Sequence, residues 1–344
     1  MNPNRKPPPV IEVRQFHSLQ PGPKLLIMGG VHGNETAGPI AIREILAEFD
    51  AGERRLQRGV LTFIPVANPV AWAGKRREGD RNLNRDFRPA ISPENAEDRI
   101  ANRLAPLLAQ HDILVDLHTF SAPGEPFVFF GPQNNQNELE PFARAAEEER
   151  LAQAIGPRRL VYGWLNAYAK GVQRRQNGSV AYGCGTTEYM RALGGIAVTV
   201  ECGQHLDPQA PVVARTAIDN VLRLLEIGGL PAADSANSTD KTRDQAASGA
   251  NTASVAHPAS ADAAGHELIE LHDVFDRHST EDQFVREWRS FDTVKAGETI
   301  ARRADGQTLC APEDGYVVFP NPGTPPGREW FYFARPGKRR LAGS

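Results

Sequence analysis

The chain has 344 residues, enough to bury a large core without disulfide bonds. Its 39 basic and 42 acidic residues give a net charge of −3, which argues against nucleic-acid binding. The three cysteines, at 184, 202 and 310, match no metal-binding or disulfide spacing. The first nine residues contain no apolar run that could act as a signal peptide, and no apolar run in the chain approaches the roughly 20 residues of a membrane span, so we expect a cytoplasmic protein that does not bind membranes.

Apolar segments typical of buried strands alternate with helical patterns through the first two thirds of the chain. The predicted strands, in chain order, are 25–28, 60–66, 113–117 and 196–200. Apolar residues repeat with helical spacing in three segments, 42–49, 100–108 and 218–225. The second of these helices is predicted to begin at Ser92 and to be kinked by Pro106. The alternation predicts an α/β fold with a mainly parallel or mixed central sheet flanked by helices.

The composition changes near residue 230. From 231 to 264 the only bulky apolar residue is Val255, which predicts a disordered low-complexity linker. After it, strand-like pieces such as Tyr-Val-Val-Phe at 316–319 stand among glycine-containing turn signals. We therefore predict a large α/β domain over 1–230, the linker over 231–264, and a small C-terminal all-β domain over 265–344.

Two candidate metal ligands follow the first predicted strand. His32 and Glu35 are three residues apart in Gly-Gly-Val-His-Gly-Asn-Glu at 29–35, so both side chains can face one point. His118 directly follows the predicted strand 113–117, and the carboxyl ends of parallel strands meet at one edge of a sheet. Two histidines and one carboxylate are a typical catalytic zinc set, so we predict one zinc ion per chain. Asp116 is expected either to orient one of the ligands or to cap the strand end.

Glu201 directly follows the apolar strand 196–200, where a surface glutamate would be unusual. It should lie at the same sheet edge as the metal ligands. A carboxylate there can take a proton from water and later give it to a leaving amine. We therefore predict that Glu201 is the general acid/base, and a salt-bridged residue at a strand end stays open as the alternative.

Basic residues are dense in the segment Lys-Arg-Arg-Glu-Gly-Asp-Arg-Asn-Leu-Asn-Arg at 75–85. Arginine binds carboxylates through paired hydrogen bonds and stabilises oxyanions, so this segment indicates an anionic substrate. A solvated charged surface is the open alternative. The motifs His-Glu-x-x-His, Gly-x-Ser-x-Gly and Gly-x-x-x-x-Gly-Lys-[Ser/Thr] are absent, which argues against three other enzyme classes.

These segments resemble the succinylglutamate desuccinylase/aspartoacylase family, which is similar in fold to the zinc carboxypeptidases. The resemblance covers nearly the whole chain outside 231–264. It lies in Gly-Val-His-Gly-Asn-Glu at 30–35, Asn-Pro at 68–69, Asn-Leu-Asn-Arg-Asp-Phe at 82–87, Asp-Leu-His at 116–118, Glu-Cys-Gly-Gln at 201–204 and Tyr-Val-Val-Phe-Pro-Asn-Pro at 316–322.

The resemblance implies a zinc-dependent hydrolase that cleaves the amide bond of a small N-acyl amino acid to a carboxylate and a free amine. It implies that Arg77 polarises the scissile carbonyl and that Asn84 and Arg85 bind a substrate carboxylate. Arg191 falls where the family places a further substrate-binding arginine. A zinc carboxypeptidase acting on peptides and a zinc-binding protein without catalysis stay open, as do the acyl group, the amino acid and homo-oligomer formation.

The chain departs from the family pattern at three places. Asn82 stands where the motif usually has aspartate, which removes a charge near the site. The segment 231–264 is unusually long before the C-terminal β domain. The C-terminal tyrosine of the aspartoacylase branch has no clear counterpart, although Tyr332 is nearby in sequence.

Overall fold

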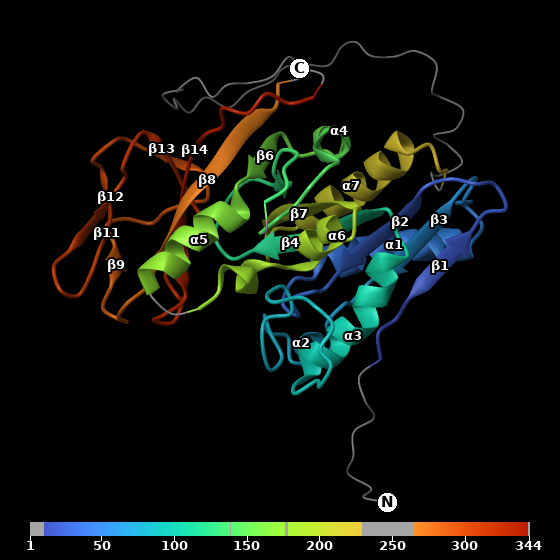
Figure 1. The fold of residues 1–344 in the computed structure, drawn as a ribbon, viewed down its shortest axis with the longest axis horizontal. Coiled ribbons are helices and arrows are strands. Elements are labelled where there is room, and N and C mark those ends of the chain that lie inside the picture. Colours follow the sequence, from blue (N-terminus) through green and yellow to red (C-terminus); the bar gives the residue numbers. More distant parts are fainter. Residues whose placement is uncertain (1–9, 138, 176–177, 229–264, 343–344) are drawn as a thin grey trace, which may run out of the picture.

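A mixed sheet runs through the computed structural model, which describes residues 10–137, 139–175, 178–228 and 265–342. Within these residues the sheet has eleven strands, in the order β1-β3-β2-β4-β7-β5-β6-β8-β14-β13-β10 (Figure 1). Their bounds are β1 Arg14–His17, β2 Lys24–Gly29, β3 Val60–Ile64, β4 Ile113–Phe120, β5 Phe127–Phe129, β6 Arg159–Tyr162, β7 Ile196–Gln204, β8 Glu267–Asp276, β10 Asp292–Val294, β13 Gly315–Val318 and β14 Glu329–Pro336. A smaller sheet in the C-terminal part has the order β12-β11-β9, with β9 Gln283–Phe284, β11 Thr299–Arg302 and β12 Thr308–Cys310.

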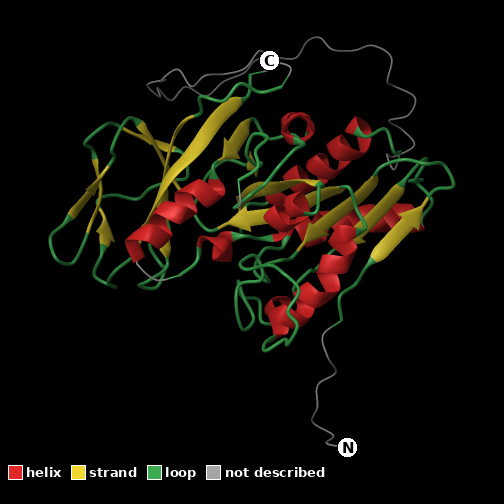
Figure 2. Cartoon of the chain, in the orientation of Figure 1, coloured by secondary structure: helices red, strands yellow, loops and turns green. Residues whose placement is uncertain are grey.

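Helices cover both faces of the central strands (Figure 2). Their bounds are α1 Ala37–Asp50, α2 Pro69–Ala73, α3 Ala96–Ala109, α4 Ala145–Ala154, α5 Trp164–Arg175, α6 Thr186–Ala192 and α7 Ala210–Leu224, with a 3-10 helix at Val180–Gly183. Buried side chains of α1, α4 and α7 pack with one face of the sheet. Those of α3 and α6 pack with the other face. No helix in the described ranges is long and apolar enough to cross a membrane.

The strands β3, β2, β4 and β7 are parallel and carry the site at their carboxyl ends. All eight residues of β4 are buried, which requires an apolar run on both faces of the strand. The parallel register pairs Met28 with Asp116, and His118 with Glu201. The predicted α/β fold with a mixed central sheet flanked by helices is therefore confirmed.

The described C-terminal residues contain only strands as regular elements, so the predicted all-β region is also confirmed. Its first strand, β8, pairs in parallel with β6, where Arg159 faces Glu267. The C-terminal strands therefore extend the main sheet. The division between 1–230 and 265–344 stays a prediction, and the linker predicted at 231–264 lies outside the described residues.

The helix α3 begins later than predicted. Asn95 is its N-cap, not Ser92, because the Asn95 side chain accepts a hydrogen bond of 2.9 Å from the backbone N–H of Asp98. The Asp98 carboxylate in turn accepts the backbone N–H of Glu94 at 3.0 Å, which holds the preceding turn. Pro106 lies inside α3 without ending it.

Candidate active site

The three predicted metal ligands converge in the structure. His32 Nδ1 lies 2.7 Å from Glu35 Oε1, and His118 Nδ1 lies 3.0 Å from Glu35 Oε2. One ligand atom from each residue can be chosen so that all lie within 4.8 Å of one another. The three residues are at most 3% exposed. This donor set, two imidazoles and a carboxylate, fits a zinc ion.

The turn that carries His32 and Glu35 requires glycine at two positions, one for its backbone conformation and one for its close packing. Gly30 has a positive φ of 61°, a conformation that favours glycine. A Cβ at Gly33 would lie 2.0 Å from the carbonyl carbon of Ala71 in α2. The turn can therefore approach α2 only with glycine at position 33.

Each histidine has a buried partner on its other ring nitrogen. His32 Nε2 lies 3.0 Å from Asn82 Oδ1. His118 Nε2 lies 3.1 Å from Asp116 Oδ2, a close contact without hydrogen-bond alignment. Burial, assisted by the charge of Arg77, lowers the pKa of His32 to about 4. His32 is therefore neutral near pH 7, as a metal ligand must be.

Glu201 is a buried carboxyl group on β7, in register with His118. It is 8% exposed, and its Oε2 has no hydrogen-bond partner among the described residues. Burial raises the pKa of Glu201 to about 8, with the charge of Glu35 adding to the rise while His118 opposes it. A carboxyl group with a pKa close to neutral can both accept and return a proton.

The arginine-rich segment lies at the same cavity. Arg77 Nη1 is 3.3 Å from Glu35 Oε1, and its side chain is 49% exposed, so it can still reach a bound molecule. The Arg85 guanidinium lies 4.7 Å from the ring centroid of Trp164, and no ion pair joins it to a carboxylate in the described part of the chain. Asn84 Oδ1 accepts the backbone N–H of Thr186 at 3.0 Å, which fixes its side chain.

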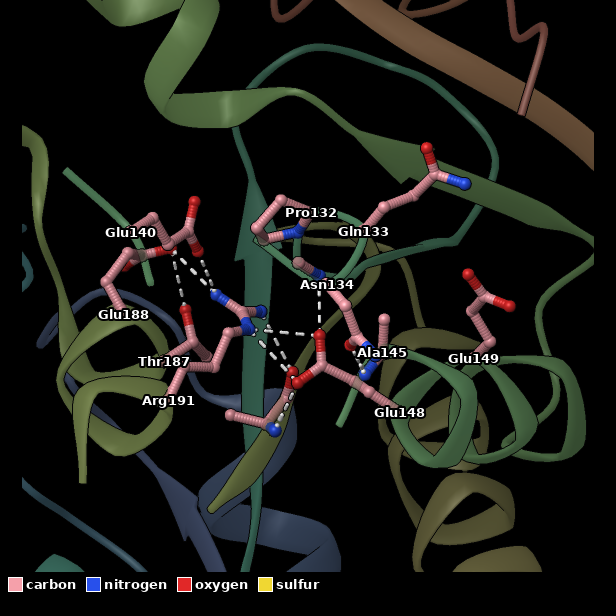
Figure 3. A network of polar contacts seen from close by, with 12 residues as sticks. Pro132, Gln133, Asn134, Glu140, Ala145, Glu148, Glu149, Thr187, Glu188 and Arg191 are labelled. Atoms are coloured by element: carbon pink, nitrogen blue, oxygen red, sulfur yellow. Dashed lines mark hydrogen bonds and ion pairs between the residues drawn. The ribbon is translucent and has the colours of Figure 1, made fainter. Parts of the chain in front are cut away.

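Arg191 lies in a network of carboxylates (Figure 3). Its Nε is 3.0 Å from both carboxylate oxygens of Glu148, and its Nη1 is 2.8 Å from Glu140 and 3.3 Å from Glu188. Its Nη2 donates to the carbonyl of Ala197 at 3.0 Å. Because every nitrogen of the guanidinium is already engaged, this geometry favours a structural role. The substrate contact expected from the resemblance stays a prediction.

A cavity of about 1040 Å³ connects these groups, and its lining includes His32, Glu35, Arg77, Arg85, His118 and Glu201. It also contains an aromatic wall that the sequence did not reveal, formed by Phe129, Trp164, Phe319 and Tyr332. Neighbouring rings of this wall have centroids 5.5–6.2 Å apart, from Phe129 to Trp164, Tyr332, Phe319 and back. The four residues lie between positions 129 and 332 of the sequence and share no spacing pattern.

His205 is a second residue of the cavity that sequence reasoning missed. Its Nδ1 lies 2.8 Å from Thr119 Oγ1, and its Nε2 lies 3.3 Å from Asn34 Nδ2. The backbone N–H of Thr119 donates to Glu35 Oε2 at 3.0 Å. His205 thus links the two segments that carry the candidate ligands. Its place four residues after Glu201 was the one available signal.

The chain is an α/β protein with a buried His–Glu–His group, which could hold a metal ion, at the carboxyl ends of parallel strands. Residues 21–225 match the model of the succinylglutamate desuccinylase/aspartoacylase catalytic domain. The match covers more than half of the chain, so the chain belongs to this family of hydrolases.

Solved structures share the fold. A crystal structure named succinylglutamate desuccinylase/aspartoacylase from Rhodobacter sphaeroides has a TM-score of 0.67 and 19% identity, over 96% of this chain and 90% of that one. The product-bound ectoine utilization protein EutE (DoeB) from Ruegeria pomeroyi has a TM-score of 0.65 and 18% identity, over 94% and 88%. At these identities the likeness concerns the fold alone.

Curated relatives match over shorter segments. A probable aspartoacylase of Parasynechococcus marenigrum (strain WH8102) is 29% identical over 116 residues, which are 31% of this chain and 37% of the relative. An N-acyl-aromatic-L-amino acid amidohydrolase (carboxylate-forming) of Rattus norvegicus is 36% identical over 118 residues, 30% of this chain and 36% of the relative. The matched segments thus span little more than a third of the length of each of these relatives.

Proposed function

We propose that this chain is a zinc-dependent deacylase that hydrolyses the amide bond of a small N-acyl amino acid. The observation that carries the proposal is the convergence of His32, Glu35 and His118 beside a buried Glu201 whose pKa is raised to about 8. These groups line the same cavity, where they would supply a metal site and a proton carrier. When bound, the zinc would supply a Lewis acid that activates water and polarises the acyl carbonyl.

The proposed role of Glu201 is to move one proton. Its carboxylate takes a proton from the attacking water and later gives it to the leaving nitrogen, so that a carboxylate and a free amine result. Arg77 donates a hydrogen bond to the carbonyl oxygen, where negative charge develops. Arg77 is suited to this because its guanidinium lies beside Glu35 and is half exposed to the cavity.

Arg85 and Asn84 are proposed to bind the carboxylate of the amino acid. Arg85 carries a charge that no carboxylate pairs with among the described residues, and it is stacked near Trp164. A guanidinium in this state can form paired hydrogen bonds with a substrate carboxylate. The hydrogen bond from Thr186 to Asn84 Oδ1 leaves the Asn84 amide NH2 group available as a donor.

The aromatic wall bears on which amino acid is released. Phe129, Trp164, Phe319 and Tyr332 present flat apolar rings to the cavity next to Arg85. Such rings favour another aromatic or large apolar group over a second charged group. The name of the Rattus norvegicus relative mentions aromatic amino acids. We therefore propose N-acyl aromatic amino acids as the preferred class, ahead of N-acyl acidic ones.

The test is the release of free amine by the zinc-loaded full chain from N-acetyl and N-succinyl derivatives of phenylalanine, aspartate and glutamate. The blanks are the Glu201→Gln variant and enzyme stripped with a chelator. We expect turnover that needs both zinc and Glu201. Cleavage of C-terminal residues from peptides alone would instead identify a carboxypeptidase, and zinc binding without any turnover would identify a non-catalytic protein.

We also propose a cytoplasmic location, supported by the composition of the chain, with its three free cysteines. Cell fractionation tests it, and recovery with secreted proteins would contradict it.

A further inference from the structure

The two histidines of the candidate metal site have unlike neighbours on the ring side that faces away from Glu35. His118 Nε2 lies 3.1 Å from a carboxylate oxygen of Asp116, whereas His32 Nε2 lies 3.0 Å from the amide oxygen of Asn82. Both partners are buried, Asp116 at 0% and Asn82 at 6% exposure. One imidazole therefore faces a full negative charge and the other a neutral oxygen.

A second contact fixes the orientation of the Asn82 amide. The backbone N–H of Asn84 donates to Asn82 Oδ1 at 2.9 Å. Because an amide NH2 group cannot accept a hydrogen bond, the oxygen must point at both Asn84 N–H and His32 Nε2. Nε2 of His32 therefore carries the ring proton. The lone pair of Nδ1 is left on the side of Glu35, where a metal would be held.

The chemical nature of this partner affects how strongly the imidazole donates to a metal. A carboxylate that accepts the ring N–H makes the imidazole more basic, and it adds attraction for a dication a few ångströms away. An amide oxygen orients the ring in the same way without the charge. His118 Nε2 has a carboxylate oxygen 3.1 Å away without hydrogen-bond alignment, whereas His32 Nε2 has a neutral amide oxygen 3.0 Å away.

We propose that Asn82 is a positioning residue that fixes His32 through a neutral oxygen and so keeps the zinc affinity of the site below that which an aspartate would give. The inference rests on the zinc site of the proposed function. It assigns a consequence to the position where the sequence departs from the usual aspartate of the family. The affinity for zinc would thus depend on one amide group.

The test compares zinc dissociation constants, measured on the full chain by competition with a chromogenic chelator. Asn82→Asp keeps the shape and both acceptor contacts and adds one charge, while Asn82→Ala removes the acceptor. The matched control is Asn220→Asp, which adds the same charge on α7, where Asn220 donates to the carbonyl of Ile155 at 3.2 Å. We expect zinc to bind about tenfold more tightly to Asn82→Asp and about tenfold more weakly to Asn82→Ala, with Asn220→Asp unchanged.

A buried charge can weaken the metal-free fold, so thermal unfolding is recorded for every variant with and without zinc. We expect the zinc-induced rise in Tm to be larger for Asn82→Asp than for the wild type, even if its metal-free Tm is lower. If Asn82 had a purely structural role, the substitutions would change the metal-free Tm. Zinc affinity would then not decrease in the order Asn82→Asp, wild type, Asn82→Ala.

The outcomes separate this inference from the proposed function. Equal zinc affinity of the wild type and Asn82→Asp would overturn the inference alone. The expected ordering without amide cleavage would overturn the proposed activity alone. A wild type that binds no zinc would overturn both.

Discussion

His118 on β4 and Glu201 on β7 are register partners across two parallel strands of the central sheet. The candidate metal ligand and the candidate acid/base are therefore placed by the same backbone pairing, on two strands whose residues are all buried except Gln204. Their separation depends on the sheet and not on a loop. A substitution of either side chain should therefore change metal binding or turnover and leave the other residue in place.

Glu201→Gln should abolish most of the turnover and leave zinc binding intact. Glutamine has the shape of glutamate but cannot carry a proton between water and the leaving amine, a loss of about 10²–10⁴ in kcat. Amine release and zinc content, measured on the same preparation, check this. Near wild-type turnover in a zinc-loaded variant would refute the assignment.

Arg77→Ala should lower kcat by about 10²–10³, because one donor to the developing oxyanion is lost. Its neighbour Arg76 also lines the cavity and is exposed, so Arg76→Ala is the matched control. The control should remain within a few-fold of the wild type. Equal effects of the two substitutions would indicate a general influence of positive charge instead of a specific hydrogen bond.

Trp164→Leu should lower the preference for aromatic over acidic substrates by about two- to tenfold, since an aromatic contact contributes about 0.5–1.5 kcal/mol. If the substitution also disturbs Arg85, every substrate with the same carboxylate is affected equally. The ratio of kcat/KM for aromatic to kcat/KM for acidic substrates therefore reports the effect of the aromatic wall alone. Tyr182→Leu is the control, because Tyr182 lines the cavity outside the wall. An unchanged ratio in Trp164→Leu, with Phe129→Leu as the second variant, would argue against a role of the wall in selectivity.

Arg191→Met should destabilise the fold by about 3–5 kcal/mol, because buried carboxylates lose their cation. Arg191 is 4% exposed and contacts Glu140, Glu148 and Glu188. Urea unfolding measures the effect, with the exposed Arg223→Met as control. A variant of normal stability and raised KM would instead support the substrate contact that the family resemblance implies.

Glu140 should make stability depend on pH. Burial raises its pKa from the usual 4.5 to about 7, an effect that Arg191 opposes and the carboxylates of Glu188 and Glu148 reinforce. The folded state then holds the proton more tightly than the unfolded state, so the stability that this group contributes is present below pH 4.5 and is lost as the pH rises through about 7. When the pH is raised from 5 to 8, the free energy of unfolding should therefore fall more for the wild type than for the Glu140→Gln variant.

Glu147→Gln is the control for this pH experiment. A hydrogen bond from Arg144 lowers the pKa of Glu147, so its contribution has the opposite sign and is lost as the pH falls. Identical pH profiles for the wild type and Glu140→Gln would contradict the raised pKa of Glu140.

The convergence of His32, Glu35, His118 and Glu201 could be predicted because each lies at or shortly after the carboxyl end of an apolar strand, a position visible in the sequence. The fold class followed from the same strands. The partners of Arg191 could not be predicted, because Glu148 lies 43 residues away and reaches Arg191 only through the packing of α4 against β7. The start of α3 was misplaced because Asn95 and Asp98 form a cap that competes with the predicted start at Ser92.

The pairing of β6 with β8 has a consequence for the integrity of the chain. Without residues 265–342, β6 would become an edge strand with a row of unpaired N–H and C=O groups, which invites association with other chains. The same loss would remove Phe319 and Tyr332 from the cavity. The N-terminal part alone should therefore tend to aggregate. Limited proteolysis that removes the C-terminal strands should be followed by self-association of the remaining fragment. It should not release a smaller active enzyme.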